Sequence, residues 1–172
     1  MTNREFYRAV SNGKQDVLQL LIEILAESET SYCVIGGLAV NAYVEPIISL
    51  DVDIVVAVGN TERVIEAAER RGFKTELFPH YVNLNLPDSD LRLQLQTDLT
   101  YQDFIPRAET KEVLGYSMAV ARLKDVLAGK KLAYQDSTRR PSKRQKDLAD
   151  IMRIVEAYPG LKAQLPDGVL PE

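Results

Sequence analysis

The chain has 172 residues, of which 45% are apolar and 27% are charged, with 21 basic against 25 acidic side chains. These proportions exclude a disordered or low-complexity protein, and the length suits one domain with a small helical addition. One cysteine and one histidine exclude a disulfide framework and multi-histidine zinc sites. No apolar run reaches the length of a membrane helix and no signal-peptide pattern opens the chain, so we expect a cytoplasmic protein without membrane contact.

Positive charge gathers in one segment of an otherwise acidic chain. Residues 122–146 hold nine basic and two acidic side chains, a net charge of +7, whereas the whole chain carries −4. Such asymmetry favours contact with phosphates or a polyanion, and the basic loop at residues 139–144 could touch RNA or DNA. The alternative is a solvated helix face followed by a polar loop.

The first quarter of the chain predicts two helices, a strand and a third helix. Residues 4–10 and 14–27 have helical character, and residues 31–35 form a short apolar run that predicts a buried strand. This run ends at Gly36-Gly37, and the following helix, at residues 38–44, is stopped by Pro46.

The middle of the chain predicts a strand, a helix and a hairpin. Residues 50–58 are rich in β-branched side chains, and residues 61–71 form an amphipathic pattern that ends at a glycine. Residues 81–86 and 91–96 flank a turn-rich tetrapeptide, which indicates a hairpin. In its second arm the leucines share one face, while Arg92, Gln94 and Gln96 share the other.

The remaining residues predict mainly helices. A helix at 101–107 and an extended piece at 113–118 precede two helices at 119–134 and 143–158. We therefore expect an α/β (α+β) fold, in which helices flank a small mixed sheet and a helical pair closes the chain. The predicted division is a core at residues 1–118 and a helical segment at residues 119–172 that packs on it.

The most informative stretch is a strand that runs into Gly36-Gly37 and then a helix. Glycines let the backbone approach a ligand closely, and the start of a helix favours an anion such as a triphosphate. Alone this is weak evidence, because tight turns use paired glycines in many proteins.

Two carboxylates follow on the next predicted strand, at Asp51 and Asp53. Side chains at i and i+2 on a strand point to the same face, about 7 Å apart. Two like charges on an apolar strand are unfavourable unless a cation lies between them, and Mg²⁺ or Mn²⁺ prefers such oxygen ligands together with substrate phosphates. The alternative is a solvent-facing acidic edge strand.

Together, Gly36-Gly37 and Asp51-Val-Asp53 resemble the signature of the DNA polymerase β-like nucleotidyltransferase superfamily. The branch of minimal nucleotidyltransferases and AbiEii-type toxins is the most similar, because Ser49 lies two positions before the first aspartate and Lys146-Asp147-Leu-Ala-Asp150 lies near the end. The resemblance spans roughly residues 30–155. It implies a mixed-sheet core, Mg²⁺, and transfer of a nucleoside monophosphate from a nucleoside triphosphate.

The resemblance also implies roles for single residues. Gly36 and Gly37 would hold the phosphates, with Ser49 supporting the loop or a phosphate, and Asp51 and Asp53 would bind metal and act in catalysis. The family usually adds a third carboxylate from a neighbouring strand.

At the third position this sequence departs from the family pattern. The residue that aligns there is Gln94, an amide that is a weak metal ligand and cannot act as a general base. Arg92 on the same face would repel a metal. Asp98 is the alternative third catalytic residue, because it is an even number of residues from Gln94 and would share its face in an extended strand.

Lysines of the two closing helices are further candidates for substrate binding. Lys130, Lys131 and Lys146 would contact phosphates, since a lysine point charge suits a triphosphate; the alternative is that they are solvent-facing helix residues. The leading hypothesis is thus a Mg²⁺-dependent nucleotidyltransferase that modifies a hydroxyl of RNA, protein or a small molecule. The missing carboxylate favours an alternative, a binding or regulatory module of the same fold, and the family analogy adds a toxin–antitoxin component.

Overall fold

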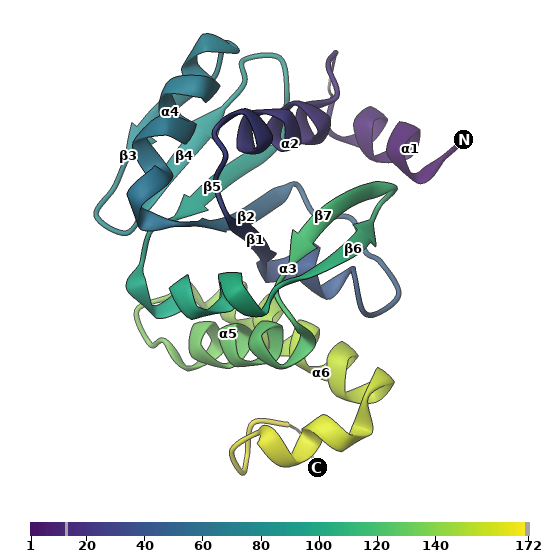
Figure 1. Ribbon diagram of the computed structural model, residues 1–172. Helices are drawn as coiled ribbons and strands as arrows, with labels where there is room; N and C mark the ends of the chain where they lie inside the picture. The colour runs from purple at the N-terminus through teal and green to yellow at the C-terminus, as the bar shows by residue number, and fades with distance from the viewer. Residues whose placement is uncertain (13, 171–172) are drawn as a thin grey trace.

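The computed structural model describes residues 1–12 and 14–170 and shows helices on both sides of one mixed sheet (Figure 1). The α-helices of the described residues are α1 (Asn3–Val10), α2 (Val17–Glu27), α3 (Gly36–Val40), α4 (Thr61–Arg70), α5 (Leu123–Gln135) and α6 (Pro141–Ala157). Short 3-10 helices are η1 (Val58–Asn60), η2 (Leu99–Arg107) and η3 (Pro159–Gln164). The strands are β1 (Tyr32–Ile35), β2 (Asp51–Val56), β3 (Lys74–Leu77), β4 (Tyr81–Asn85), β5 (Arg92–Gln96), β6 (Glu109–Val113) and β7 (Tyr116–Val120). The predicted α/β class with a mixed sheet is confirmed.

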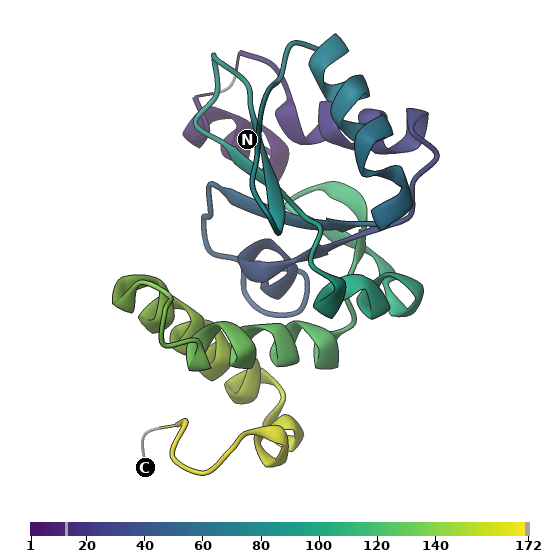
Figure 2. The same cartoon turned by 90° about the vertical axis from the view of Figure 1, so that its left-hand side faces the viewer.

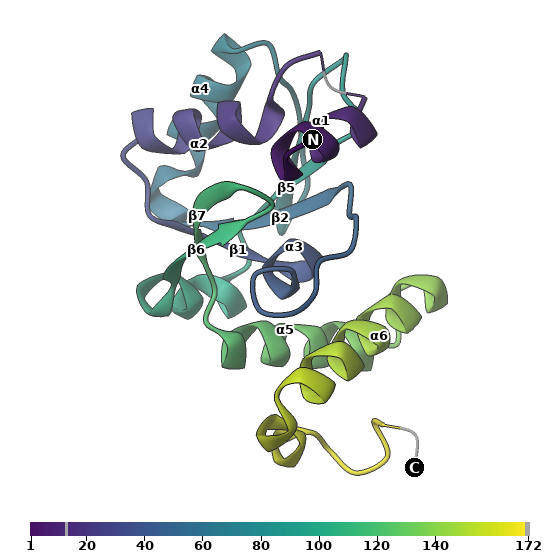
Figure 3. The ribbon, with the colours of Figure 1, turned by 90° about the vertical axis from the view of Figure 1, so that its right-hand side faces the viewer.

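The helices form two layers with the sheet between them. Figure 3 shows α1, α2 and α4 on one side, and α3, α5 and α6 on the other. Helix α3 contacts β2 and also both closing helices, so it fills the space between the sheet and the α5–α6 pair. Figure 2 shows that pair as a separate layer below the sheet, with η3 on its far side.

The central strand β2 separates an apolar from a polar face. Val52 and Ile54 are almost fully buried beneath the α2–α4 layer. Asp51 and Asp53, which alternate with them along the strand, are half-buried on the opposite face. Because side chains alternate along a strand, burial of the two apolar residues fixes both carboxylates toward the α3, α5 and α6 side.

The order of the strands is β3-β4-β5-β2-β1-β7-β6. Strand β2 runs antiparallel to β1 and parallel to β5, and in this register Asp53 lies opposite Gln94 and Asp51 opposite Arg92. Gln94 therefore lies beside the aspartate pair, and its alignment with the third carboxylate of the family stays a prediction. Strands β4 and β5 pair antiparallel, which confirms the predicted hairpin.

In the first half of the chain one predicted helix has other bounds and one strand was missed. The helix expected at residues 38–44 spans Gly36–Val40 instead. It ends early because the Asn41 side chain bonds both the N–H and the C=O of Ile47, closing a loop before Pro46 takes effect. Strand β3 was not predicted, because this edge strand is mostly exposed and lacks an apolar alternation.

The extended piece expected at 113–118 is a hairpin of two strands, β6 and β7. Leu114 and Gly115 form its turn with φ of 52° and 85°, the positive values that a tight two-residue hairpin requires. Strand β7 continues to Val120, so the next helix begins at Leu123 and not at Ala119. The division at residue 118 stays a prediction. Within the described residues, no helix is long and apolar enough to cross a membrane.

Candidate nucleotide site

A cavity of about 860 Å³ lies between the polar face of the sheet and the closing helices. The structure brings eight of the sequence-predicted site residues to its wall: Gly36, Gly37, Ser49, Asp51, Asp53, Gln94, Lys130 and Lys146. Lys130, Arg139 and Lys143 line it from α5, the following loop and α6. The cavity thus joins carboxylates of the sheet to cations of the helices.

Gly36 allows the backbone to pass directly over Asp53. Its φ is +68°, and a Cβ atom there would lie 2.6 Å from the Asp53 Oδ2. Any other residue would therefore be strained and would push against the carboxylate. Gly37 faces a roomier part of the wall, where a Cβ atom would lie 3.7 Å from the Ser49 Oγ.

Ser49 supports the loop that leads into β2. Its hydroxyl accepts a hydrogen bond from the Asp51 N–H at 3.3 Å and lies 3.2 Å from the Asp51 C=O. From α1, the Tyr7 hydroxyl donates to the Ser49 C=O at 2.7 Å, and burial raises the pKa of this tyrosine. The start of β2 is therefore held from two sides.

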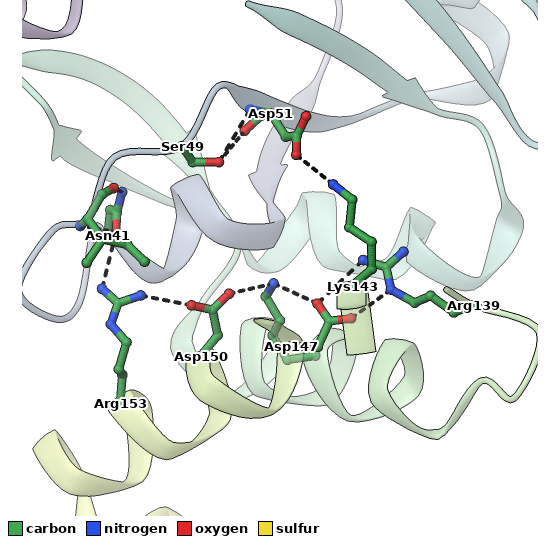
Figure 4. Close-up of polar contacts among 10 residues, drawn as sticks. Asn41, Ser49, Asp51, Arg139, Lys143, Asp147, Asp150 and Arg153 are labelled. Carbon is green, nitrogen blue, oxygen red and sulfur yellow. Dashed lines mark hydrogen bonds and ion pairs between the residues drawn. The ribbon is translucent and has the colours of Figure 1, made fainter. Parts of the chain in front are cut away.

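Asp51 forms two ion pairs. Arg92 Nε lies 2.6 Å from Oδ1, and Lys143 Nζ lies 2.9 Å from Oδ2, as Figure 4 shows for the lysine. Burial alone would raise the pKa of Asp51, but the Lys143 hydrogen bond and the charges of Lys143 and Arg92 outweigh it and lower the pKa. Asp51 is thus an ionised carboxylate with both oxygens engaged.

Asp53 has a different environment. Within residues 1–12 and 14–170, no lysine, arginine or histidine forms an ion pair with it. Burial raises its pKa, and the attraction of Lys130 only partly opposes this effect. Asp53 therefore lines the cavity without a cationic partner among the described residues.

Beneath the glycine turn lies a buried cluster of opposite charges (Figure 4). Lys130 Nζ lies 3.0 Å from Asp147 Oδ1 and 2.7 Å from Asp150 Oδ2, although the second pair lacks hydrogen-bond geometry. Arg139 pairs with Asp147 at 2.7 Å, and Arg153 pairs with Asp150 at 2.8 Å. Lys130, Asp147 and Asp150 are each less than 10% exposed, so the cluster joins α5 to α6 below the cavity.

Gln94 belongs to a chain of amides at the sheet face. Its Nε2 donates to the Asn83 Oδ1 at 3.0 Å, and its Oε1 accepts from the Gln96 Nε2 at 2.7 Å. Asn83 comes from β4, where it lies opposite Gln94. The position opposite Asp53 on β5 therefore holds an uncharged hydrogen-bonding group.

Two sequence-predicted residues do not reach the cavity. The Asp98 carboxylate accepts a hydrogen bond from the Thr100 N–H at 2.8 Å, at the start of η2, and lies 3.8 Å from the His80 Nδ1. Lys131 donates to the Gln164 C=O on the other side of α5. Neither residue lines the cavity, and the lysine that does is its neighbour Lys130.

The donor set can be compared with the needs of a divalent cation. Among the described residues, no group of three or more His, Cys, Asp and Glu side chains could hold a metal ion. Two carboxylates on one strand, one of them engaged by cations, do not make a resident metal site. They do fit Mg²⁺ that arrives with a nucleotide, because Mg²⁺ keeps several waters and uses one or two carboxylates plus phosphates.

Sequence reasoning missed several residues of the cavity. Lys143 appeared only as part of a basic loop, because nothing in the sequence places it beside Asp51, 92 residues away. The amides of β4 could have been predicted to face the cavity, because Asn83 and Asn85 alternate with apolar residues that are buried. Their number on one face could have indicated a polar wall.

Comparison with solved structures identifies the architecture. The lincosamide antibiotic adenylyltransferase LnuA in its lincomycin-bound form has a TM-score of 0.57 at 14% identity, with 80% of this chain and 95% of LnuA covered. ANT(2")-Ia in complex with adenylyl-2"-tobramycin has a TM-score of 0.63 at 12% identity, with 86% and 91% covered. The chain has the nucleotidyltransferase fold.

A third structure agrees with this result. An antigenic nucleotidyltransferase-like protein from Paracoccidioides brasiliensis has a TM-score of 0.54 at 18% identity, with 88% of each chain covered. No protein-family model matches the sequence, and no curated protein matches it either. At these identities the comparisons establish the nucleotidyltransferase fold alone.

Proposed function

We propose that this protein binds a nucleoside triphosphate with Mg²⁺ and transfers its nucleoside monophosphate to a hydroxyl group of an acceptor. The observation that carries the proposal is the position of Asp51 and Asp53 in one cavity with the glycine turn and the cations of the closing helices. Carboxylates on one wall and cations on the opposite wall are what a metal-bound triphosphate needs, because its phosphates accept both kinds of partner.

Each part of the cavity has a role in this proposal. Gly36 and Gly37 let the phosphates approach the backbone, and Arg139, Lys143 and Lys146 neutralise their charge. Asp51 and Asp53 would hold Mg²⁺, which would stabilise the negative charge on the transferred phosphoryl group. Lys143 would exchange its contact with Asp51 for one with a phosphate.

Gln94 supports a second candidate, a nucleotide-binding module without turnover. General base catalysis typically contributes about 10²–10⁴-fold to a rate, and an amide cannot take up the proton of the acceptor hydroxyl. The first candidate therefore predicts slow transfer, whereas the second predicts nucleotide binding with no transfer at all.

Calorimetry and radiolabelling separate these candidates. Purified protein is titrated with each of the four NTPs in Mg²⁺, and the same samples are assayed for transfer of α-labelled NMP. Asp53→Asn should abolish transfer, and Asp98→Asn, outside the cavity, is the matched control. Binding without transfer would refute the transferase and support the nucleotide-binding module. A protein that binds none of the four NTPs would refute both candidates.

The resemblance to AbiEii-type toxins supports one finer proposal, a toxin of a toxin–antitoxin pair. The segment that carries it, Lys146-Asp147-Leu-Ala-Asp150, supplies Lys146 to the cavity and Asp147 and Asp150 to the buried cluster. Growth arrest on expression, relieved by Asp53→Asn, would support a toxin. Harmless expression of an active enzyme would exclude it.

A further inference from the structure

The cavity has a third wall that the proposed nucleotide site does not use. Four amide side chains, Asn83, Asn85, Gln94 and Gln96, line it from neighbouring strands β4 and β5. All four are half-buried, and the residues between them are buried in the apolar core. The wall is therefore built into the sheet and is not a mobile surface feature.

The amides are arranged in a directed series of hydrogen bonds. Gln96 donates to Gln94, and Gln94 donates to Asn83. Because each amide has two N–H donors and an oxygen with two lone pairs, the series leaves the Gln96 oxygen and the Asn83 N–H groups free at its two ends. Such alternating donors and acceptors match hydroxyl groups, which both donate and accept.

The wall begins directly beside Asp53. Gln94 lies opposite Asp53 in the register of β2 and β5, and Asn83 lies opposite Gln94 on the next strand. Neighbouring strands are about 4.8 Å apart, so Asn83 lies about 10 Å from Asp53 along this row. That span suits a ring-sized molecule with one hydroxyl at Asp53.

The charges around the wall argue against an ionic acceptor. Glu76 is exposed at the outer end of the row, opposite Asn83, and Arg92 is engaged by Asp51. The remaining cations of the cavity lie on the loop and helices across from the sheet. Among the described residues, the wall carries one peripheral carboxylate, Glu76, and no cation without a carboxylate partner. Asp53, at its inner end, is assigned to Mg²⁺ in the proposed function.

We propose that the amide wall is the acceptor subsite and that it takes an uncharged, hydroxyl-rich small molecule such as a sugar, a cyclitol or a nucleoside. This inference rests on the proposed function. In-line displacement requires the attacking oxygen to lie opposite the leaving pyrophosphate. With the triphosphate held at the cationic wall, the amide wall is on the attacking side.

In the proposed reaction a nucleoside monophosphate passes from the triphosphate to a hydroxyl of the acceptor, with pyrophosphate as the leaving group. The acceptor oxygen forms a bond to the α-phosphorus, and the bond between that phosphorus and the bridging oxygen of pyrophosphate breaks. Pyrophosphate leaves with the electron pair of the broken bond. The hydroxyl proton passes to solvent water, because Gln94 has no site that can take it up.

The test compares acceptors of three charge classes with the full chain, Mg²⁺ and α-labelled NTP. The uncharged probes are a set of sugars, cyclitols and nucleosides that includes trehalose, myo-inositol and adenosine; tobramycin is the polycation, and an oligoribonucleotide with a free 3′-hydroxyl is the polyanion. At least one uncharged probe should take up label ten-fold faster than either charged probe. Labelling only of tobramycin or RNA would overturn the inference, as would the failure of every uncharged probe with protein that binds NTP.

Two variants connect the result to the wall. Asn83→Leu and Gln96→Met keep side-chain size but remove the free hydrogen-bonding groups, so each should raise the KM for the uncharged acceptor at least ten-fold. The Kd for NTP should stay within two-fold, and Gln135→Met, exposed at the end of α5, is the matched control. An unchanged KM in both folded variants would refute the subsite while leaving the proposed function intact. An unaltered protein that binds no NTP, or that labels no probe of any charge class, would refute the proposed transfer itself.

Discussion

The ammonium group of Lys143 lies 2.9 Å from the Asp51 Oδ2, although 92 residues separate them in sequence. With Arg92 on the other oxygen, the two cations more than neutralise the single negative charge of the carboxylate. A divalent cation therefore competes with Lys143 for Asp51, and the lysine is free to move to a phosphate when a nucleotide enters.

Removing the lysine should strengthen metal binding in the absence of nucleotide. In Lys143→Met the Asp51 Oδ2 is released, so we expect Mn²⁺ alone to bind about ten-fold more tightly, and NTP to bind more weakly because a phosphate contact is lost. Electron paramagnetic resonance of free Mn²⁺ measures the first effect, and calorimetry the second. Lys162→Met, exposed in η3, is the control, and equal Mn²⁺ affinity in all three proteins would contradict the competition.

The same ion pairs give the stability a dependence on pH. Lys143 and Arg92 lower the pKa of Asp51, so their stabilising effect is complete above the ordinary carboxylate value and is lost as the pH falls through the lowered pKa. The stability difference between the unaltered protein and Lys143→Met should therefore shrink on acidification from pH 7. Urea titrations of both proteins at pH 7 and pH 3 measure it, and a difference that grows at pH 3 would be inconsistent with this assignment.

The glycine pair should separate into one essential and one tolerant position. Gly36→Ala must adopt a left-handed backbone and displace the Asp53 carboxylate, so we expect a loss of about 1–2 kcal/mol in stability and at least ten-fold weaker NTP binding. Gly37→Ala adds a methyl group in ordinary van der Waals contact with Ser49, so its stability and NTP affinity should be close to those of the unaltered protein. Similar losses for both variants would show that close backbone approach at Gly36 is not the cause.

The buried Lys130 should matter for stability far more than its neighbour. Lys130→Met leaves Asp147 and Asp150 with one cation fewer in a buried environment, which typically costs about 3–5 kcal/mol. Lys131→Met removes a contact with the Gln164 C=O on the exposed side of the helix and should cost less than about 1 kcal/mol. Urea unfolding followed by circular dichroism gives both values, and equal costs would refute a structural role for the cluster.

Cys33 should report on global unfolding. It is fully buried in β1, and burial raises the pKa of its thiol to about 12. Since the thiolate is the reactive form, a thiol reagent at pH 8 should not label native protein, and the labelling rate should rise with urea in parallel with unfolding. Rapid labelling without denaturant would mean that β1 opens locally.

Restoring a carboxylate at the third position should accelerate transfer. Gln94→Glu places a proton acceptor beside Asp53, so we expect kcat to rise at least ten-fold with little change in the Kd for NTP. The pH profile should also gain an acidic limb, because the new base must be ionised. Gln94→Met controls for loss of the amide, and an unchanged rate in Gln94→Glu would show that proton removal does not limit the reaction.

The sequence was sufficient for the parts of the fold that have a strong local pattern. The alternation around Asp51 and Asp53 predicted β2 and the face of its carboxylates. The alternation around Gln94 predicted only the face it shares with Arg92 and Gln96, and its place beside the aspartates came from the family resemblance. The turn at Leu114 was missed because β6, the strand before it, has a single apolar residue, Val113. Edge strand β3 was missed for the same physical reason, since little of it is buried.

Long-range contacts account for what the sequence did not predict at the site. Lys130 and Lys131 are adjacent and chemically alike, and only the packing of α5 against α6 decides which one faces the cavity. Asp98 has the right parity for the third position, but η2 begins there and uses its carboxylate as a cap. Periodicity gives the face of a residue within its own element, and it gives no information on how distant elements meet.

Of the six cationic side chains that the described residues contribute to the cavity wall, Arg92 precedes residue 121 and the other five follow it. Asp51 and Asp53 precede residue 121, while Lys130, Arg139, Lys143 and Lys146 follow it. A chain cut at this point would yield an acidic and a basic fragment that attract each other across the future binding surface. Such fragments should associate when mixed, and their affinity should fall as salt is added. Nucleotide should strengthen the association, because it binds only the assembled form. An affinity that does not change with ionic strength would argue against electrostatic recognition.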